Sequence, residues 1–196
     1  GTLRFDGKPA TPTGPKRVAY LRDMQLIYQH PYEALSPRLT VGAAIAEPLK
    51  RHNLCPKGEV AAKVHDLMAQ VDLSRDLSDR LPGQLSGGQC QRVAIARALA
   101  FDPRVLIADE VTSALDVTLQ AQVLDLLLKL QRDRGLTIIF ISHDLAIIRR
   151  LCNSVLVMRR GEIVEAGATQ EVFDNPKETY TRDLLDAIPK LDGGAA

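Results

Sequence analysis

Apolar runs separated by polar turns divide the chain into predicted strands and helices. Residues 24–28, 105–108 and 137–141 are the main strand candidates, and polar residues directly follow each run. The second and third runs are continuously apolar, which is typical of parallel strands buried on both faces. Residues 3–8 alternate and then turn, so they are expected to end a strand and enter a loop.

Helical periodicity is present between and after these strands. Residues 59–71, for example, carry Val60, Val64, Leu67 and Val71 at the spacing of one helix face. Helices are predicted at about 41–50, 59–71, 91–100, 119–130 and 145–151, with two shorter ones around Glu171 and Leu184.

Turn-forming residues mark two further segments. Residues 154–158 and 162–165 flank Arg159-Arg160-Gly161, a pattern that predicts a β-hairpin. Three prolines within residues 9–15 predict irregular structure there. The alternation of strands and helices indicates an α/β fold with a parallel sheet and a helical insertion at roughly 31–100.

Composition narrows the class of protein further. Hydrophobic residues make up 45% of the 196 residues, enough for a folded core, and the net charge of +1 lacks the basic excess of a general nucleic-acid binder. Cys55, Cys90 and Cys152 are widely spaced, which argues against a zinc site or a disulfide framework, and Cys90 is interpreted as a packing residue. We find no signal peptide and no apolar run of membrane-spanning length, so other subunits are expected to cross any membrane.

Polar residues with catalytic potential follow two of the predicted strands. Asp109 and Glu110 follow one strand, and His143 follows another. Ligands of open parallel sheets bind beyond the carboxyl ends of the strands, so these side chains are expected to share a site. One carboxylate can help to hold Mg²⁺ while the next orients a water that attacks a phosphoryl group. The alternative is that both carboxylates only mark the entry to a loop.

Ser86-Gly87-Gly88, at the start of a predicted helix, is a second feature that suits phosphate. Glycines let backbone N–H groups approach an anion, the helix N-terminus adds a partial positive charge, and Ser86 adds a hydroxyl. The alternative is an ordinary helix start, in which Ser86 is the N-cap and the glycines form a turn. For these three residues alone, the ordinary helix start is the simpler interpretation.

The longer run of residues 85–92 resembles the signature motif of the ATP-binding-cassette (ABC) ATPases. Four more segments resemble motifs of that family in the same order: Gln29 the Q-loop glutamine, 105–110 the Walker B strand, 113–116 the D-loop and His143 the switch histidine. The resemblance covers nearly the whole chain. It implies an α/β, P-loop NTPase-like fold with a parallel sheet core, an inserted α-helical subdomain and ATP hydrolysis.

Two segments are similar to a narrower group, the oligopeptide, dipeptide and nickel importer ATPases. Residues 28–38 resemble the Q-loop region of that group, and Asn175-Pro176 with residues 180–185 resemble its tail. This similarity implies a subunit that powers the import of a peptide, a dipeptide or a related solute. A generic importer ATPase is the alternative.

The resemblance implies a role for each matching residue. Asp109 would help to bind Mg²⁺, and Glu110 would be the catalytic carboxylate beside the hydrolytic water. His143 would contact the γ-phosphate, and Gln29 would sense Mg²⁺ and the water, so Gln29 and Asp109 are the expected metal-site residues. Val111 stands where the family usually has proline, which frees a φ angle but removes no reacting group.

The signature would act on a different nucleotide, because two domains of this family meet head to tail. Ser86, Gly87, Gly88 and Gln89 would close the site of a partner, and Asp116 would lie in the interface. The expected partners are a second ABC ATPase subunit, transmembrane permease subunits and, indirectly, a solute-binding protein, with no nucleic acid. ATP and Mg²⁺ are the expected cofactors, and the expected location is the cytoplasmic face of the cell membrane.

As an ABC ATPase domain, the chain is expected to be partial. A phosphate-binding loop needs Gly-x-x-x-x-Gly-Lys-Ser/Thr, and the 196 residues contain no such run. The chain is therefore expected to start downstream of this loop and to be inactive alone. The sheet core is expected at 1–30 and 101–168, the helical subdomain at 31–100 and a tail at 169–196.

Two other functions stay open on these patterns. A non-hydrolysing partner would use its signature only to complete another subunit's site, although such a subunit has no need of Glu110 and His143. A soluble ABC ATPase acting on DNA or ribosomes predicts a long coiled-coil insertion or a basic arm, and the 196 residues show neither.

Overall fold

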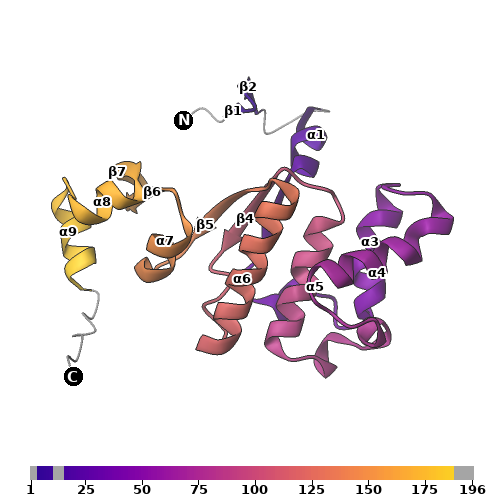
Figure 1. The fold of residues 1–196 in the computed structure, drawn as a ribbon. Coiled ribbons are helices and arrows are strands. Elements are labelled where there is room, and N and C mark those ends of the chain that lie inside the picture. Colours follow the sequence, from indigo (N-terminus) through magenta and orange to yellow (C-terminus); the bar gives the residue numbers. More distant parts are fainter. Residues whose placement is uncertain (1–3, 11–15, 188–196) are drawn as a thin grey trace. The chain divides into compact units, whose positions relative to one another are not determined.

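The computed structural model describes residues 4–10 and 16–187. The chain divides into two compact units, Gly1–Ile141 and Ser142–Ala196, and each is described by itself (Figure 1). No helix within the described ranges is long and apolar enough to cross a membrane. The division into sheet core, helical subdomain and tail stays a prediction.

A parallel sheet of three strands forms the centre of the first unit. β4 (Val105–Asp109) lies between β3 (Met24–Ile27) and β5 (Thr137–Ile141). Ile27 of β3 pairs with Ala108 of β4, and β4 pairs with β5 up to the last residue of each strand. The three strands therefore end at one edge of the sheet, and their predicted parallel arrangement is confirmed.

The two faces of this sheet differ in burial. Leu106 and Ala108 of β4 are fully buried and belong to the helix-packed core of the unit. Ile139 and Ile141 of β5 are each 47% exposed. The prediction that residues 137–141 are buried on both faces is therefore wrong, because the described part of the chain leaves one face of this strand open.

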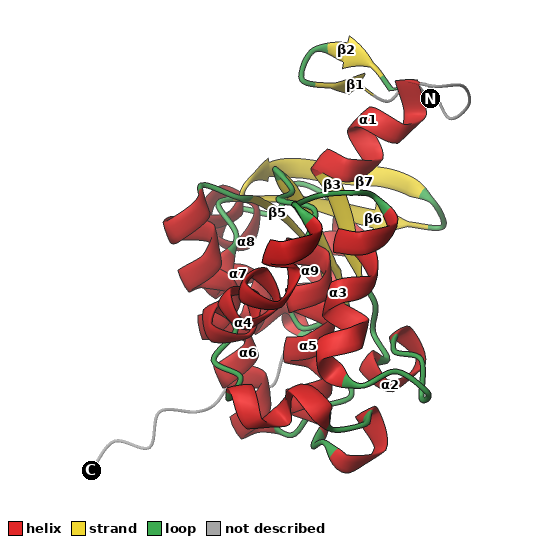
Figure 2. Cartoon of the chain, turned by 90° about the vertical axis from the view of Figure 1, so that its right-hand side faces the viewer, coloured by secondary structure: helices red, strands yellow, loops and turns green. Residues whose placement is uncertain are grey.

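The segment between β3 and β4 is helical (Figure 2). Its α-helices are α2 (Pro31–Ala34), α3 (Val41–Arg51), α4 (Val60–Gln70) and α5 (Gly87–Leu99), and short 3-10 helices at Lys57–Glu59, Arg75–Asp79 and Pro82–Gln84 lie in the segments that join them. α3 packs against both α4 and α5, as the neighbouring positions of these helices in Figure 1 indicate. The apolar spacing that predicts α4 marks the packed face of the helix, where Leu67 is fully buried.

Helix α6 (Val117–Arg134) packs beside α5 and completes the core of the first unit. Asp116 caps its start, where its carboxylate accepts a 2.9 Å hydrogen bond from the Leu119 N–H. The helix stops at Gly135, whose φ of 63° lies in the left-handed region that glycine adopts easily. α6 is longer than the predicted 119–130 at both ends, because Asp116 starts the helix two residues earlier and the helix continues to Arg134, directly before Gly135.

Before β3, the chain forms a small antiparallel ladder of β1 (Arg4–Phe5) with β2 (Lys8–Pro9), and then helix α1 (Lys16–Asp23). The irregular structure expected around the prolines falls partly on residues 11–15, which lie outside the described residues. The sequence patterns do not predict α1. Proline breaks a helix only in its interior, so prolines ahead of residue 16 are compatible with a helix that begins there.

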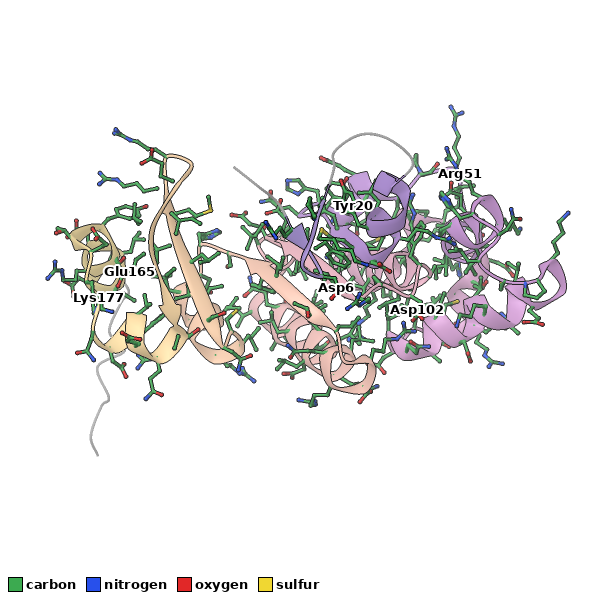
Figure 3. The ribbon with its side chains drawn as sticks, turned by 90° about the horizontal axis from the view of Figure 1, so that it is seen from above. Asp6, Tyr20, Arg51, Asp102, Glu165 and Lys177 are labelled. Carbon is green, nitrogen blue, oxygen red and sulfur yellow. The ribbon has the colours of Figure 1, made fainter. Side chains whose placement is uncertain are left out.

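The second unit is built on the predicted β-hairpin. Its elements are α7 (Leu145–Leu151), β6 (Ser154–Arg159), β7 (Glu162–Ala168), α8 (Thr169–Asp174) and α9 (Thr179–Asp186). β6 and β7 pair antiparallel, and both tail helices are present, as predicted. Glu165 of β7 is buried and accepts hydrogen bonds from the backbone N–H groups of Lys177 at 2.9 Å and Glu178 at 3.2 Å. Figure 3 labels Glu165 and Lys177, which lie side by side.

Candidate functional site

The carboxyl ends of β3 and β4 bring together two side chains that are 81 residues apart in the sequence. Ile27 and Ala108 are paired across the strands, and Gln29 and Glu110 each lie two residues beyond this pair. The Nε2 atom of Gln29 donates a 2.8 Å hydrogen bond to Oε2 of Glu110. The register of the sheet explains why these two side chains meet.

Ser113 extends this contact into a small network. Gln29 Nε2 also donates to Oγ of Ser113 at 3.1 Å, and that hydroxyl donates to the backbone carbonyl of Glu110 at 3.0 Å. The two acceptors hold the amide nitrogen of Gln29, rather than its oxygen, toward Glu110. This contact of Ser113 is not among the expectations drawn from the sequence. The sequence signal for this contact is the position of Ser113, whose hydroxyl follows the candidate carboxylate of Glu110 by three residues.

The backbone at Glu110 is in a left-handed conformation, with a φ of 47°. A long side chain rarely adopts this conformation, and such strain gathers at functional sites. The Glu110 N–H donates a 3.0 Å hydrogen bond to the carbonyl of Ile141, so the neighbouring strand holds the turn. The next residue, Val111, is 1% exposed and packs in the core. The hydrogen bond to Ile141 and the buried side chain of Val111 therefore fix the backbone on both sides of Glu110, and with it the direction of the carboxylate.

Asp109 is the last residue of β4 and is half-buried at the edge where the strands end. Mg²⁺ prefers oxygen ligands and keeps several waters when it binds together with phosphates. Asp109 offers a carboxylate, and Gln29 offers its amide oxygen because its nitrogen is engaged with Glu110 and Ser113. Asp109 and Gln29 therefore carry oxygen ligands of the kind that could hold Mg²⁺. Within the described ranges, no three His, Cys, Asp or Glu residues are grouped to hold a metal ion by themselves.

Ser86 begins α5 as its N-cap. Its Oγ accepts a 3.3 Å hydrogen bond from the Gln89 N–H, and Oε1 of Gln89 accepts a 2.9 Å bond from the Ser86 N–H. This reciprocal capping box is the ordinary helix start that the sequence analysis weighs as an alternative. Anion binding is compatible with the cap, because the first turn of this 13-residue helix keeps its partial positive charge.

The two glycines at the start of α5 have a packing role of their own. A Cβ atom at Gly87 would lie 3.4 Å from a methyl group of Leu115, and one at Gly88 would lie 3.0 Å from a methyl group of Leu119. The start of α5 therefore approaches both the segment that leads into α6 and the first turn of α6. Asp116, the N-cap of α6, belongs to that segment.

Tyr32 of α2 reaches the residue before the α5 cap. Its hydroxyl donates a 3.0 Å hydrogen bond to the carbonyl of Leu85. Burial of this hydroxyl raises its pKa, and the nearby Cys90 raises it further. Cys90 is fully buried, with its Sγ 3.5 Å from the carbonyl of Pro82, and burial raises the pKa of its thiol. The packing interpretation of Cys90 is confirmed, whereas the contact of Tyr32 with Leu85 is not visible in the sequence.

His143 lies in the loop that follows β5, two residues after the strand ends, and is exposed. It belongs to the second unit, whereas Gln29, Asp109 and Glu110 belong to the first. The adjacent Asp144 caps α7, where its carboxylate accepts hydrogen bonds from two backbone N–H groups. The role of His143 stays a prediction.

Comparison with known proteins identifies the family, since the ABC transporter family model matches residues 1–113. The chain belongs to the ABC transporter family. The glutathione import ATP-binding protein GsiA of Pectobacterium atrosepticum is 48% identical over 193 residues, which are 98% of this chain and 31% of GsiA. GsiA of Escherichia coli strain K12 is 47% identical over 190 residues, or 96% of this chain and 30% of GsiA. This ABC chain thus spans about a third of the length of these curated relatives.

Two solved structures share the fold of this ABC chain. One is cbiO1 from Clostridium perfringens, part of the ABC transporter complex cbiONQ, with 29% identity and a TM-score of 0.78 over 95% of this chain and 72% of that one. The other is a dimeric ATP-binding cassette in a post-hydrolysis state with ADP and Pi, with 28% identity and a TM-score of 0.70 over 84% and 72% of the two chains. The predicted α/β, P-loop NTPase-like fold is therefore confirmed, as is the resemblance to ABC importer ATP-binding subunits.

Proposed function

We propose that this ABC chain acts as an ATP-hydrolysing subunit that powers the import of a peptide-like solute. The 2.8 Å hydrogen bond between Gln29 and Glu110 carries the proposal. It joins an amide and a carboxylate at the sheet edge where parallel α/β folds bind their ligands. The relatives support the solute class, because GsiA is a glutathione import protein and glutathione is a peptide.

In this proposal Glu110 orients and polarises the attacking water. The water oxygen bonds to the γ-phosphorus, and the bond from that phosphorus to the β–γ bridging oxygen breaks, so that ADP leaves with the electron pair of that bond. Glu110 takes a proton from the water and returns it to an oxygen of the inorganic phosphate that forms. The left-handed backbone at Glu110 and its contact with Gln29 support a positioning role, because both fix the direction of the carboxylate. His143 would donate a hydrogen bond to the γ-phosphate.

Asp109 and the amide oxygen of Gln29 would hold Mg²⁺. When bound, the ion would neutralise negative charge that develops on the phosphates. The hydrogen bonds that Gln29 makes to Glu110 and Ser113 support its share in this site, since they turn its oxygen away from the carboxylate. Gln29 would then contact the metal site and the catalytic carboxylate with opposite ends of one amide group.

The signature would serve a nucleotide bound by a second ABC subunit. Ser86 is exposed at the start of α5, and Gly87, Gly88 and Gln89 form its first turn. The dimeric relative with ADP and Pi supports this arrangement. Asp116 would lie near the same interface, because the segment it belongs to packs against the start of α5. The partner's γ-phosphate would then receive the helix N-terminus and the Ser86 hydroxyl.

Further partners would complete the importer. Transmembrane permease subunits would form the path for the solute, a solute-binding protein would deliver it, and this chain would sit peripherally on the cytoplasmic face of the membrane. The cbiO1 relative supports such an assembly, since it is described as part of a transporter complex. Nucleic acid has no part in this proposal.

The test uses a loop-extended protein, in which a Gly-x-x-x-x-Gly-Lys-Ser/Thr phosphate-binding loop is joined ahead of residue 1. It should release phosphate from ATP, and Glu110→Gln should lower kcat by about 10²-fold or more while ATP still binds. The 196 residues alone should show no appreciable turnover, because they contain no such loop. Near-full turnover by Glu110→Gln would show that Glu110 is not the catalytic carboxylate.

The same assay separates the alternative of a non-hydrolysing partner. Such a subunit would stay inactive as the loop-extended protein, yet it would raise hydrolysis by an ABC subunit whose own signature is disabled. The strained backbone at Glu110 and its bond to Gln29 favour hydrolysis, because a subunit that only lends its signature gains nothing from them.

A further inference from the structure

Helix α2 connects the candidate catalytic residues with the signature. It is four residues long, Pro31–Ala34, and starts two residues after Gln29. From its second residue, the hydroxyl of Tyr32 donates a 3.0 Å hydrogen bond to the carbonyl of Leu85, 53 residues away. The acceptor is the residue directly before Ser86, the N-cap of α5.

A second contact fixes the other end of α2. The carbonyl of Ala34, its last residue, accepts a 2.9 Å hydrogen bond from Nη1 of Arg97 on α5. The other terminal nitrogen of Arg97 lies 3.5 Å from a carboxylate oxygen of Glu47 on α3. Two hydrogen bonds therefore hold α2 against α5. Tyr32 bonds to the residue before the α5 cap, and Arg97, near the C-terminal end of α5, bonds to Ala34. We expect α2 and α5 to move together.

We propose that Tyr32 is a positioning residue that sets the start of α5, and with it Ser86, relative to the Gln29–Glu110 pair. This inference rests on the proposed function, in which Gln29 and Glu110 serve the chain's own nucleotide and Ser86 serves the partner's. Tyr32 then links two nucleotide sites through one chain. The hydroxyl of Tyr32 bonds to the carbonyl of Leu85, directly before the helix. A small displacement of Leu85 therefore changes the direction of the first N–H groups of α5.

The hydroxyl suits this role, and removing it is a clean change. A tyrosine hydroxyl is protonated at neutral pH, since its ordinary pKa is about 10 and burial only raises that pKa here, so Tyr32 stays a donor. The residue is 50% exposed, so Tyr32→Phe removes the bond to Leu85 and the contact of the hydroxyl with the Cys90 thiol without opening a cavity in the core. Tyr28→Phe is a matched control, since Tyr28 lies just ahead of Gln29 and is 58% exposed.

The first experiment mixes two loop-extended chains. One carries Ser86→Arg and keeps Glu110, and the other carries Glu110→Gln and keeps Ser86. Each is inactive alone, and the mixture restores one composite site if the proposed function is right. Tyr32→Phe in the chain that donates Ser86 should lower kcat by roughly three- to tenfold, with the KM for ATP changed less than twofold. The same change in the chain that donates Glu110 should have no effect, and neither should Tyr28→Phe in either chain.

The outcomes separate the two claims. If Tyr32→Phe lowers kcat equally in either chain, its effect is a general structural one and the inference fails. The inference also fails if kcat falls only when the change is in the chain that donates Glu110. A parent mixture that stays inactive although mixed dimers form counts against composite sites, and hence against the proposed function.

Hydrogen exchange decides the inference without any turnover. In the loop-extended protein, Tyr32→Phe should speed amide exchange at Gln89 and Cys90, which lie in the first turn of α5, and Tyr28→Phe should not. Unchanged exchange at both amides would show that the hydroxyl does not hold the start of α5, and the inference would fail even if hydrolysis were normal.

Discussion

The amide nitrogen of Gln29 lies 2.8 Å from a carboxylate oxygen of Glu110, although 81 residues separate them in the chain. Ser113 accepts from the same nitrogen and donates back to the carbonyl of Glu110. Its hydroxyl is thus linked to the proposed catalytic carboxylate of Glu110 through Gln29. This arrangement predicts that the two side chains act as one unit on the carboxylate.

A double-mutant cycle in the loop-extended protein measures this dependence. Ser113→Ala should lower kcat by roughly three- to tenfold, because Gln29 loses one of its two acceptors. Gln29→Leu should cost more, since Glu110 then loses the hydrogen bond from Gln29 and the proposed metal site loses an oxygen. In the Gln29→Leu background, Ser113→Ala should have little further effect. Steady-state phosphate release gives all four rates.

Gln25→Leu is the control for this cycle, because Gln25 lies on β3, the strand that leads to Gln29, and bonds to the carbonyl of Leu21 instead. Its kcat should stay within about twofold of the parent. Fully additive losses in the Gln29 and Ser113 variants would contradict the network and leave Ser113 with an independent role.

The sequence predicts the candidate site in part. Asp109 and Glu110 are recognisable because an apolar strand ends directly before them, and the sheet register shows why Gln29 joins Glu110. The contacts of Ser113 and Tyr32 are not predictable in this way. They depend on side-chain rotamers and on the distance between segments far apart in the chain, which no local pattern records.

Apolar periodicity predicts an element well where one face of that element packs against the core, as in α4. The strand at 137–141 shows the limit, because its continuous apolar run predicts burial on both faces and Ile139 and Ile141 are half-exposed. An apolar pattern indicates which faces of a strand are able to pack. Whether a face is buried also depends on whether another part of the structure covers it. Helix α1 shows the opposite limit, since the prolines ahead of residue 16 obscure a helix that they do not prevent.

Gly42 of α3 should be sensitive to any side chain. A Cβ atom there would overlap Oγ of Ser78 and lie 3.2 Å from the Ser78 carbonyl oxygen, which is fixed in the backbone of a neighbouring turn. Overpacking costs about 1–3 kcal/mol and alanine's helix propensity offsets about 1, so Gly42→Ala should lower the free energy of unfolding by about 1 kcal/mol. Gly58→Ala is the control, since no heavy atom lies within 4 Å of its Cβ position. Urea denaturation of both variants compares them, and equal midpoints would contradict the packing argument.

Cys90 should be the last of the three cysteines to react with iodoacetamide. It is fully buried, and burial raises the pKa of its thiol, so less of the reactive thiolate is present at a given pH. Cys55 is half-buried and should be labelled in the native protein at pH 8. Mass spectrometry of the labelled peptides measures the order, and labelling in urea should make all three equally reactive. Native labelling of Cys90 as fast as Cys55 would show that the core around α5 opens readily.

Glu165 holds the start of α9 by accepting hydrogen bonds from the N–H groups of Lys177 and Glu178. The hydrogen bond from the Lys177 backbone is the largest cause of a lowered pKa at this carboxyl. A lowered folded-state pKa means that the ionised form stabilises the docked tail above the ordinary pKa of about 4.3, and that this contribution is lost as the pH falls through the folded value. Glu165→Gln should therefore speed amide exchange at Lys177 and Glu178 at pH 7.

The pH dependence distinguishes the charge from the shape of the side chain. As the pH falls below about 4.3, wild-type exchange at the two amides, corrected for the intrinsic rate at each pH, should approach that of Glu165→Gln, because protonated Glu165 also lacks the charge that strengthens both bonds. Glu162→Gln, an exposed position on the same strand, should match the wild type at every pH. A difference between wild type and Glu165→Gln that persisted unchanged in acid would mean that packing, rather than ionisation, docks the tail.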